Sequence, residues 1–363
     1  MTGELETAAL GARSAAAAIA SSGRAVVGIV GRDVPALLVA AADAHPFRIA
    51  PEGAPTDETD RFLGRAVDRA ATLVLASVLD GSLDFLSGIL LSRDTESSVR
   101  LFYTLQELHR RGRTTVGVSL VDQVHQNRES TVQFNIAQLA GMVRTLESWT
   151  STPITEASLS DAHAELVGLR AELERMRAER RARRLAGTTA LHAYRVAAAL
   201  PPATTMELLR ATTTEPTDAA FPLFLTGSAP LGDEVYRAVE AVGATVVGED
   251  HDWGDPILSD ELPARVDRGR EQLLRDLALA RLGGAPASAS STMAARASAT
   301  RDGIIATGAR ALLSVVRPHD DAPAWDWRLQ SARAGVPAVM VRGDAADDPQ
   351  QIVAAVESLR AAS

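Results

Sequence analysis

The sequence lacks two residue types that carry much of protein chemistry. Its 363 residues include no cysteine, and all 37 basic residues are arginine, so lysine is absent as well. Without lysine the chain cannot form a Schiff base or build a phosphate loop that relies on lysine. Without cysteine it provides no thiolate nucleophile, no disulfide, and no zinc or iron–sulfur site with cysteine ligands. Its chemistry must therefore use carboxylates, hydroxyls, imidazoles and guanidinium groups.

Aromatic residues and basic charge are also scarce. Aromatic side chains make up 4% of the sequence, and 46 acidic against 37 basic residues give a formal net charge of −9. Such a chain lacks the basic field and the stacking surface that nucleic-acid binding uses. No apolar run approaches about 18 residues, and the Ala-rich start carries Glu4 and Glu6 instead of a basic leader. We therefore expect a cytoplasmic protein that does not bind membranes and begins with a helical extension over residues 1–22.

An internal repeat organises the sequence. Residues 25–50 (AVVGIVGRDVPALLVAAADAHPFRIA) and 221–248 (FPLFLTGSAPLGDEVYRAVEAVGATVVG) follow the same plan. In each, an apolar strand leads into a turn where glycine is followed by proline, then into an amphipathic helix and a second short strand. Gly31 and Gly227 permit a tight exit from the strand, and the proline suits the first turn of a helix. The repeat predicts two lobes of the same architecture.

Each half continues with alternating helices and strands. The further elements that we expect are helices at 58–79 and 96–111 and strands at 88–94 and 115–121 in the first half, and helices at 258–282, 324–334 and 349–361 and strands at 302–308 and 337–343 in the second. Short apolar strands that alternate with helices form parallel sheets through right-handed crossovers. We therefore predict an α/β fold of two similar doubly wound parallel-sheet lobes, each with about four strands.

A helical insert separates the two lobes. Residues 127–149 and 156–184 have helical spacing, and Pro201 and Pro202 interrupt the helices before the second sheet. Glutamates alternate with the arginines near the end of the second helix, which favours a solvated helix face over a nucleic-acid site. The predicted domains are the extension 1–22, the first lobe 23–125, the helical insert 126–215 and the second lobe 216–363.

Candidate site residues follow the expected strands. In open parallel sheets, ligands bind at the carboxyl ends of the strands, near the point where the strand order reverses. The residues there are Gly31, Arg32, Arg93, Asp94, Gly227, Ser228, His251 and Asp252. Arg93 with Asp94 forms either an ion pair or an anion site. Neither half contains a G-x-G-x-x-G run after its first strand, and no G-x-S-x-G elbow is present.

The densest polar cluster is the segment 249–255. Together with His319, Asp320 and Asp321 it is either a divalent-metal site or, as we favour, an acidic loop with helix-capping aspartates. His251 has the chemistry of a general acid or base. The Ala- and Ser-rich stretch 285–300 is either a loop over the site or a connection without a defined role.

Five segments, taken in order, resemble the 2-hydroxyacyl-CoA dehydratase/benzoyl-CoA reductase family. They are 34–51 (VPALLVAAADAHPFRIAP), 79–97 (LDGSLDFLSGILLSRDTES), 134–155 (FNIAQLAGMVRTLESWTSTPIT), 225–255 (LTGSAPLGDEVYRAVEAVGATVVGEDHDWGD) and 302–344 (DGIIATGARALLSVVRPHDDAPAWDWRLQSARAGVPAVMVRGD). The resemblance is to a dehydratase D-component-like subunit and covers nearly the whole chain. It implies two similar lobes with a helical part, and subunits that pair with related chains.

The resemblance also implies a cofactor that this sequence does not support. In the family, cysteines in the cleft hold a [4Fe–4S] cluster that binds the acyl-CoA substrate and takes part in radical dehydration or ring reduction, with electrons from an ATP-driven activator. Here the family's cysteine positions fall near Ala71 or Thr72, near Thr95, and at Asp252. Carboxylate and hydroxyl oxygens are poor substitutes for thiolates on such a cluster. We expect no cofactor or metal in this chain, and a [4Fe–4S] cluster in a partner chain.

Three functions fit the resemblance. The chain is a subunit of an acyl-CoA lyase or reductase complex whose cysteine-bearing homologous partner holds the cluster, a redox-neutral acyl-CoA lyase or hydratase that uses acid–base groups or a metal, or a noncatalytic acyl-CoA-binding or scaffold subunit. In each case acyl-CoA is expected between the lobes, with these residues around it: Gly31, Arg32, Arg93, Asp94, Gly227 and Ser228 for binding, and His251 and Asp252 for polar or acid–base contact.

Overall fold

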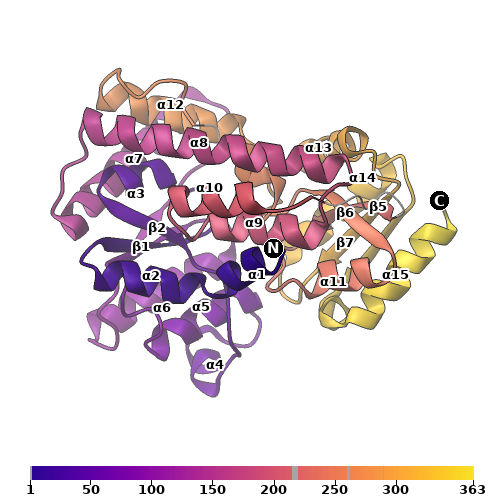
Figure 1. Cartoon of the computed structure of the whole chain (residues 1–363). Coiled ribbons are helices and arrows are strands. Elements are labelled where there is room, and N and C mark those ends of the chain that lie inside the picture. The colour runs from indigo at the N-terminus through magenta and orange to yellow at the C-terminus, as the bar shows by residue number, and fades with distance from the viewer. Residues whose placement is uncertain (1, 215–219, 260–261, 289) are drawn as a thin grey trace.

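Two four-stranded parallel sheets form the framework of the protein (Figure 1). In the computed structural model, which describes all residues except 1, 215–219, 260–261 and 289, the strands are β1 (Ala25–Val30), β2 (Ala44–Arg48), β3 (Gly88–Ser92), β4 (Gly117–Val121), β5 (Phe221–Gly227), β6 (Ala244–Glu249), β7 (Ala311–Val316) and β8 (Ala338–Arg342). The strand orders are β2-β1-β3-β4 and β6-β5-β7-β8, so the two sheets share one topology. The prediction of two similar doubly wound lobes is confirmed.

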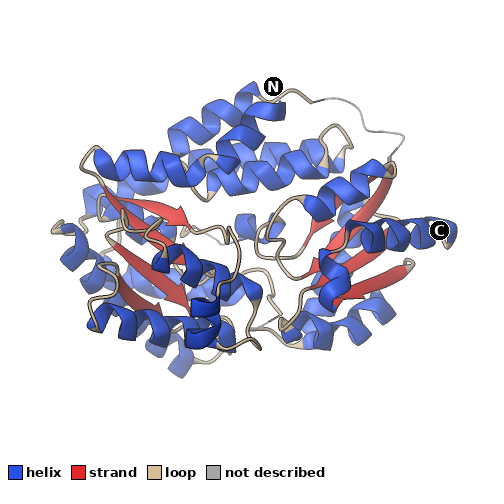
Figure 2. Cartoon of the chain, turned by 90° about the horizontal axis from the view of Figure 1, so that it is seen from below, coloured by secondary structure: helices blue, strands red, loops and turns tan. Residues whose placement is uncertain are grey.

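Helices cover both faces of each sheet (Figure 2). They are α1 (Thr2–Leu10), α2 (Ala12–Ser21), α3 (Ala36–Ala41), α4 (Asp57–Leu63), α5 (Arg69–Leu79), α6 (Glu96–Arg110), α7 (Glu129–Thr150), α8 (Glu156–Arg181), α9 (Gly187–Ala197), α10 (Pro202–Ala211), α11 (Glu234–Ala241), α12 (Arg270–Gly283), α13 (Met293–Thr307), α14 (Asp321–Arg333) and α15 (Pro349–Ala361), with the 3₁₀ helices η1 (Asp255–Ser259) and η2 (Gly343–Asp347). In the first lobe α2, α5 and α6 pack on one face and α3, α7 and α12 on the other. In the second lobe α11 and α15 face α13 and α14 across the sheet.

The central strands are apolar because both of their faces are covered. Strand β3 (GILLS) and strand β7 (ALLSVV) are buried along their whole length. A strand that is buried on both faces has a continuous apolar sequence. A strand with one face exposed to water alternates between apolar and polar residues. The same composition explains why these strands form the middle of each sheet.

The helices between the sheets tie the lobes together. Helix α8 runs from the first lobe to the second (Figure 1), contacting α3 on one side and β6 on the other. Near its end, the buried Arg180 reaches Glu249 of β6. Helix α9 packs against β6 and against the N-terminal α1, and α7 packs on β4 and α12. The domain boundaries given above stay a prediction.

Two predicted elements of the second half are wrong. Residues 302–308 do not form a strand; they end α13, where Gly308 adopts a left-handed conformation (φ 64°) that stops the helix. The strand is instead the longer apolar run of β7. The predicted helix 258–282 begins later, at Arg270 after Gly269 (φ 83°), with residues 260–261 outside the described part. Short apolar pairs such as Ile304–Ile305 fit a helix or a strand equally well, which is why periodicity misplaced the strand.

One predicted helix of the first half is divided. The stretch 58–79 contains α4 and α5, because Gly64 (φ 79°) ends the first helix and the Asp68 carboxylate caps the second by accepting from the Ala70 N–H. The division matters because it places Asp68 at a helix start instead of on a helix face. The stretch 285–300 is likewise divided, into a loop and the start of α13.

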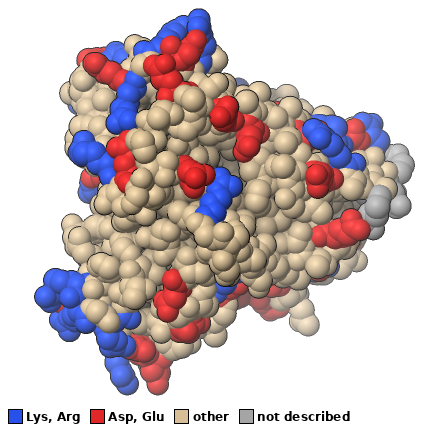
Figure 3. Space-filling view, turned by 60° about the vertical axis from the view of Figure 1, so that its left-hand side comes forward, with Lys and Arg blue, Asp and Glu red and all other residues tan. Residues whose placement is uncertain are grey.

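The surface carries charges of both signs. Figure 3 shows acidic and basic side chains on the same face, with uncharged side chains over much of it. Within the described part of the chain, no helix combines the length and the apolar character needed to cross a bilayer.

Candidate functional site

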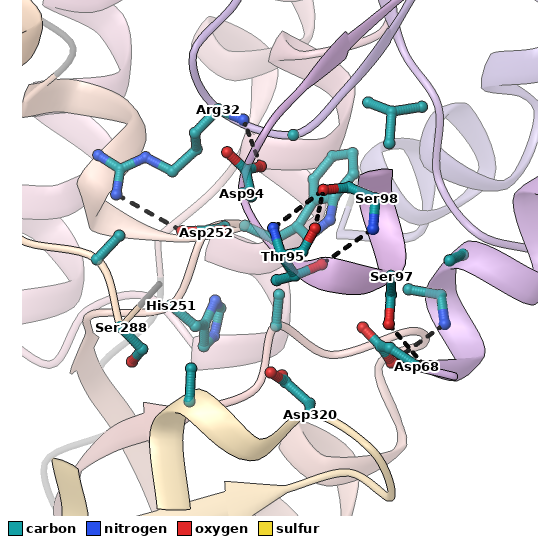
Figure 4. Close-up of a pocket in the computed structure, with 18 of the residues that line it drawn as sticks. Arg32, Asp68, Asp94, Thr95, Ser97, Ser98, His251, Asp252, Ser288 and Asp320 are labelled. Atoms are coloured by element: carbon teal, nitrogen blue, oxygen red, sulfur yellow. Dashed lines mark hydrogen bonds and ion pairs between the residues drawn. The ribbon is translucent and has the colours of Figure 1, made fainter. Parts of the chain in front are cut away.

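A cavity of about 180 Å³ lies where the carboxyl ends of the two sheets face each other (Figure 4). We call it the interlobe cavity. Its polar walls come from the first lobe (Gly31, Arg32, Arg48, Asp68, Asp94 and Thr95) and from the second half of the chain (Gly227, His251, Asp252, Arg281, Arg296, Arg317 and Asp320). The turns after β1 and β5 contribute to this cavity. The strand order of each sheet reverses beside these strands, between β1 and β3 and between β5 and β7. This is the position at which open parallel sheets bind ligands.

Two glycines bring the walls of the cavity close together. Gly31 has φ 92° and Gly227 has φ 112°, both in the region that favours glycine. A Cβ atom at Gly31 would lie 2.2 Å from Asp94 Oδ2, and one at Gly227 would lie 2.2 Å from the Val315 carbonyl oxygen. The turn after the first strand of each lobe is therefore pressed against the end of the neighbouring strand, which is the physical basis of the glycine in the sequence repeat.

Arg32 connects the two lobes at the cavity wall. Its backbone N–H donates to Asp94 Oδ2 at 3.2 Å, and its Nη1 lies 3.5 Å from Asp252 Oδ1 (Figure 4). The Arg32 side chain is almost fully buried. Burial would by itself raise the pKa of Asp252, but the positive charges of Arg32 and Arg48 outweigh it and hold that pKa below its ordinary value. Asp252 is therefore a carboxylate whose charge is matched from the opposite lobe.

Asp94 differs from its neighbours in keeping its proton. Burial, reinforced by the negative charges of Asp33 and Asp252, raises the pKa of Asp94 to about 8. At Asp33 burial also acts to raise the pKa, but the hydrogen bond from His125 and the charge of Arg281 hold it below its ordinary value. At pH 7 the Asp33 carboxyl group is therefore ionised and the Asp94 carboxyl group is neutral. A neutral carboxyl group has an O–H that can donate a hydrogen bond.

Two further arginines close the cavity across the lobes. Arg48 donates from Nη1 to the Asp252 carbonyl oxygen at 2.7 Å, and its guanidinium lies 4.2 Å from the centre of the Trp253 ring. Arg317 forms an ion pair with Asp68 at 2.9 Å. These contacts join residues that are far apart in the sequence, so the facing lobes are held by charge pairs as well as by packing.

His251 lies in the cavity wall with one ring nitrogen unpaired (Figure 4). Its Nε2 is 2.9 Å from the Tyr236 hydroxyl, which donates to Glu249 Oε2 at 3.0 Å. Because the single hydroxyl proton goes to the carboxylate, Nε2 carries the imidazole proton and Nδ1 keeps its lone pair. Nδ1 is buried and has no hydrogen-bond partner among the described residues. Burial lowers the pKa of His251 to about 3, so the ring is neutral and its Nδ1 can accept a hydrogen bond.

A buried ion-pair network holds the histidine in this state. Arg180 Nη1 donates to Glu249 Oε2 at 2.5 Å, and Nη2 donates to Asp255 Oδ1 at 2.6 Å. The Arg180 and Glu249 side chains have no exposed surface. Tyr194 of α9 also donates to Asp255 Oδ1, at 2.5 Å. The helical segment therefore supplies the cation that pairs with Glu249 behind Tyr236, and Tyr236 in turn fixes the His251 tautomer.

The structure brings most of the predicted site residues together. Those that line the interlobe cavity are Gly31, Arg32, Asp94, Gly227, His251 and Asp252. Ser228 lies behind the wall, where its hydroxyl accepts from the Arg317 N–H at 3.0 Å. Arg93, which we predicted to bind the ligand, does not line this cavity: its side chain is exposed and forms an ion pair with Asp122 at 3.1 Å. The ion pair between Arg93 and Asp94, one of the two alternatives left open above, is not formed.

The sequence analysis did not predict several of the residues that line the cavity, although some of them lie at strand ends. Arg48 ends β2 and Arg317 follows β7, so both lie at carboxyl strand ends, but Arg317 was hidden because the strand was placed at 302–308. Asp68 was not predicted because the sequence analysis placed it within one continuous helix, whereas it lies between α4 and α5. Arg281 and Arg296 lie on α12 and α13 and had no strand-end signal. Asp320 lines the cavity as well, whereas His319 is exposed.

The fold and the site define a class of protein: a two-lobed α/β protein with a charged ligand cavity at the facing switch points of its lobes. Residues 33–360 match the family model of the 2-hydroxyglutaryl-CoA dehydratase, D-component. The match spans most of the chain, and the protein belongs to this family. No curated protein sequence matches the chain.

The residues present do not fit the iron–sulfur cluster that the resemblance implies. The resemblance places the family's cysteines near Ala71 or Thr72, near Thr95 and at Asp252; of these residues Ala71, Thr95 and Asp252 line the interlobe cavity and Thr72 does not. Ala71 has no donor atom, the Thr95 hydroxyl accepts from the Ser98 N–H at 3.1 Å in a capping box, and Asp252 is paired with Arg32. In the described residues no cluster of three or more acidic or histidine side chains has the arrangement of a metal site.

Proposed function

We propose that this chain binds an acyl-CoA thioester in the interlobe cavity, as a subunit of a dehydratase- or reductase-like complex. Family membership supports the class of substrate. The cavity supports the place, because it lies at the switch points of both lobes and is lined by arginines, which are the residues suited to phosphate and carbonyl oxygens.

One observation carries the proposal. Residues at or near the positions where the resemblance places the family's cysteines line this cavity, and they carry a methyl group at Ala71, a capping hydroxyl at Thr95 and a paired carboxylate at Asp252. This chain therefore has a cavity at these positions but lacks the cysteine ligands of the cluster. A ligand other than the cluster accounts for its retention, and the substrate thioester is the other ligand that the family binds there. The cluster then belongs to a related, cysteine-bearing partner subunit.

The same residues also support a second candidate function, redox-neutral acyl-CoA lyase or hydratase activity. Asp94 keeps a proton at neutral pH and His251 offers an unpaired Nδ1, both in the wall of one cavity. A neutral carboxyl group can donate a hydrogen bond and a neutral imidazole can accept one. In this function Asp94 donates a hydrogen bond to the thioester carbonyl oxygen, and His251 Nδ1 accepts one from the water that is added or eliminated.

Ligand binding is the first test. Isothermal titration calorimetry with CoA and acetyl-CoA compares the wild-type chain with Arg48→Met, which removes a cavity charge while keeping the aliphatic stem. Loss of one charged hydrogen bond is expected to weaken binding by about 10- to 150-fold, which corresponds to about 1.5–3 kcal/mol. The matched control is Arg93→Met, which removes an exposed arginine paired with Asp122 and is expected to leave affinity unchanged. Absence of CoA-ester binding to the chain and to its complex would remove the proposal.

The partner is tested by coexpression with a cysteine-bearing homologue from the same genome. Light scattering of the purified sample is expected to give a mass for both chains, and iron with acid-labile sulfide is expected to follow the partner. Stoichiometric iron and sulfide in the isolated chain would contradict the assignment. Turnover of a 2-hydroxyacyl-CoA by the isolated chain would favour the second function, and tight binding with neither partner nor turnover would leave a noncatalytic binding subunit.

A further inference from the structure

A second cavity, of about 230 Å³, lies beside the interlobe cavity and has a different lining. We call it the apolar chamber. Its walls are mainly aliphatic side chains from α8, α9, η1 and α12, among them Leu169, Leu173, Ala197, Leu258, Leu277 and Ala280. Most of the leucines belong to the buried cores around the first sheet. The chamber is therefore walled largely by side chains of the packed core, with charged residues at its boundary.

The two cavities share one boundary. Gly31, Arg32, Arg48 and Arg281 line both of them. Each arginine is held by an acceptor: Arg32 by the Asp252 carboxylate, Arg48 by the Asp252 carbonyl oxygen, and Arg281 by the Asp33 carboxylate. The boundary is thus polar and fixed, and Gly31 lacks the side chain that would narrow it.

The size and lining of the chamber point to an apolar ligand. Protein interiors contain few voids larger than a water molecule, so a large apolar void is unusual unless a ligand fills it. An apolar cavity of about 150 Å³ stays dry and binds benzene. The chamber is larger than that, and so has room for an apolar group of at least the size of a benzene ring.

We propose that the apolar chamber holds the acyl group of the thioester, which makes the substrate an acyl-CoA with an apolar acyl group of roughly six carbons. This inference rests on the proposed function. The thioester lies at the boundary beside Gly31, with CoA on the polar side and the acyl chain in the chamber. The leucines would remove hydration from a distal carboxylate, and Asp33, which also lines the chamber and stays ionised, would repel it, so an apolar acyl group is favoured although Arg170 lines the chamber as well.

The test measures affinity against chain length by titration calorimetry with acetyl-, butanoyl-, hexanoyl- and glutaryl-CoA. Each buried methylene is expected to tighten binding about fourfold, or roughly 200-fold from acetyl to hexanoyl. Glutaryl-CoA, which carries a distal carboxylate, is expected to bind more weakly than hexanoyl-CoA. The titrations use the full chain, and the coexpressed complex if the ester binds only there.

A filling variant locates the acyl group. Ala280→Phe places a ring in the chamber and is expected to abolish the dependence on chain length while acetyl-CoA still binds. Leu279→Phe is the matched control, because Leu279 is the next residue of the same helix but is exposed and does not line the chamber. Ala197→Leu fills the chamber from α9 if Ala280→Phe does not fold.

The outcomes separate this inference from the proposed function. Binding of CoA and acetyl-CoA without any gain from hexanoyl-CoA overturns the acyl chamber and leaves the proposed function standing. Tighter binding of glutaryl-CoA than of hexanoyl-CoA overturns the apolar substrate class in the same way. If no CoA ester binds to the chain or its complex, the proposed function falls and the acyl chamber with it. Length dependence that Ala280→Phe removes and Leu279→Phe retains supports the inference.

Discussion

Replacing Asp94 by asparagine is expected to stabilise the protein at neutral and alkaline pH. The pKa of Asp94 is about 8 in the folded protein against an ordinary value of 3.8, because of burial and the neighbouring negative charges. Between these values the unfolded chain releases the proton and the folded protein does not, so stability falls as the pH rises and levels off above about pH 8. The full difference corresponds to about 6 kcal/mol. Asp94 borders the cavity and is half-buried, and cavity water screens part of its charge, so we expect a gain of about 2–4 kcal/mol for Asp94→Asn at pH 8.

Urea unfolding at a series of pH values from 5 to 9 measures this effect. The free energy of unfolding of Asp94→Asn minus that of the wild type is expected to grow by up to about 1.4 kcal/mol per pH unit. The asparagine oxygen can still accept from the Arg32 N–H, so the turn itself is kept. The control Asp122→Asn removes a carboxylate that pairs with exposed Arg93, and is expected to change stability by less than about 1 kcal/mol. A difference between Asp94→Asn and wild type that stays constant across the pH series would refute the reasoning.

Three further predictions concern the network and the turns. Arg180→Met leaves two buried carboxylates uncompensated and is expected to destabilise the protein by about 3–5 kcal/mol in chemical unfolding, whereas the exposed Arg184→Met should change it by less than about 1 kcal/mol. The His251 imidazole is expected to remain neutral at pH 5 in nitrogen-15 NMR, because burial lowers its pKa to about 3; an imidazolium signal at that pH would contradict the assigned tautomer. Gly31→Ala is expected to lower the melting temperature more than Gly53→Ala, since both have positive φ but only the first meets atoms within 4 Å.

The fold was predictable from the sequence to the extent that burial produces apolar runs. The strands of the first lobe and β5, β6 and β8 of the second follow from short apolar segments that alternate with helices. The exception is β7, because Ile304 and Ile305 near Gly308 imitate a strand end, and only the three-dimensional packing of α13 against α14 distinguishes the two. The break between α4 and α5 was not predicted either, because a single glycine in an amphipathic stretch is compatible with a continuous helix.

The site was predictable where it depends on strand ends and not where it depends on helices. Arg32, Asp94 and His251 follow strands, and the rule for parallel sheets places them together. Arg281 and Arg296 reach the cavity from helices whose direction is set by packing across the lobes, and no local pattern encodes that. The pairing of Arg93 with Asp122 instead of a ligand depends on which way one side chain leaves the strand end, which spacing does not specify.

The three positions that correspond to cysteines now have structural roles of their own, which argues that the loss of the cluster is built into this protein. The Thr95 hydroxyl caps α6, and loss of such a cap is expected to cost about 1 kcal/mol. Asp252 balances the charge of Arg32, so a neutral thiol there would leave a buried guanidinium without its carboxylate. Ala71 packs in the core of the first lobe, where its methyl group is buried. Cysteine at these positions would therefore disturb a helix start, a charge pair and a packed core, and ion pairs such as Arg32 with Asp252 and Arg317 with Asp68 join the cavity walls.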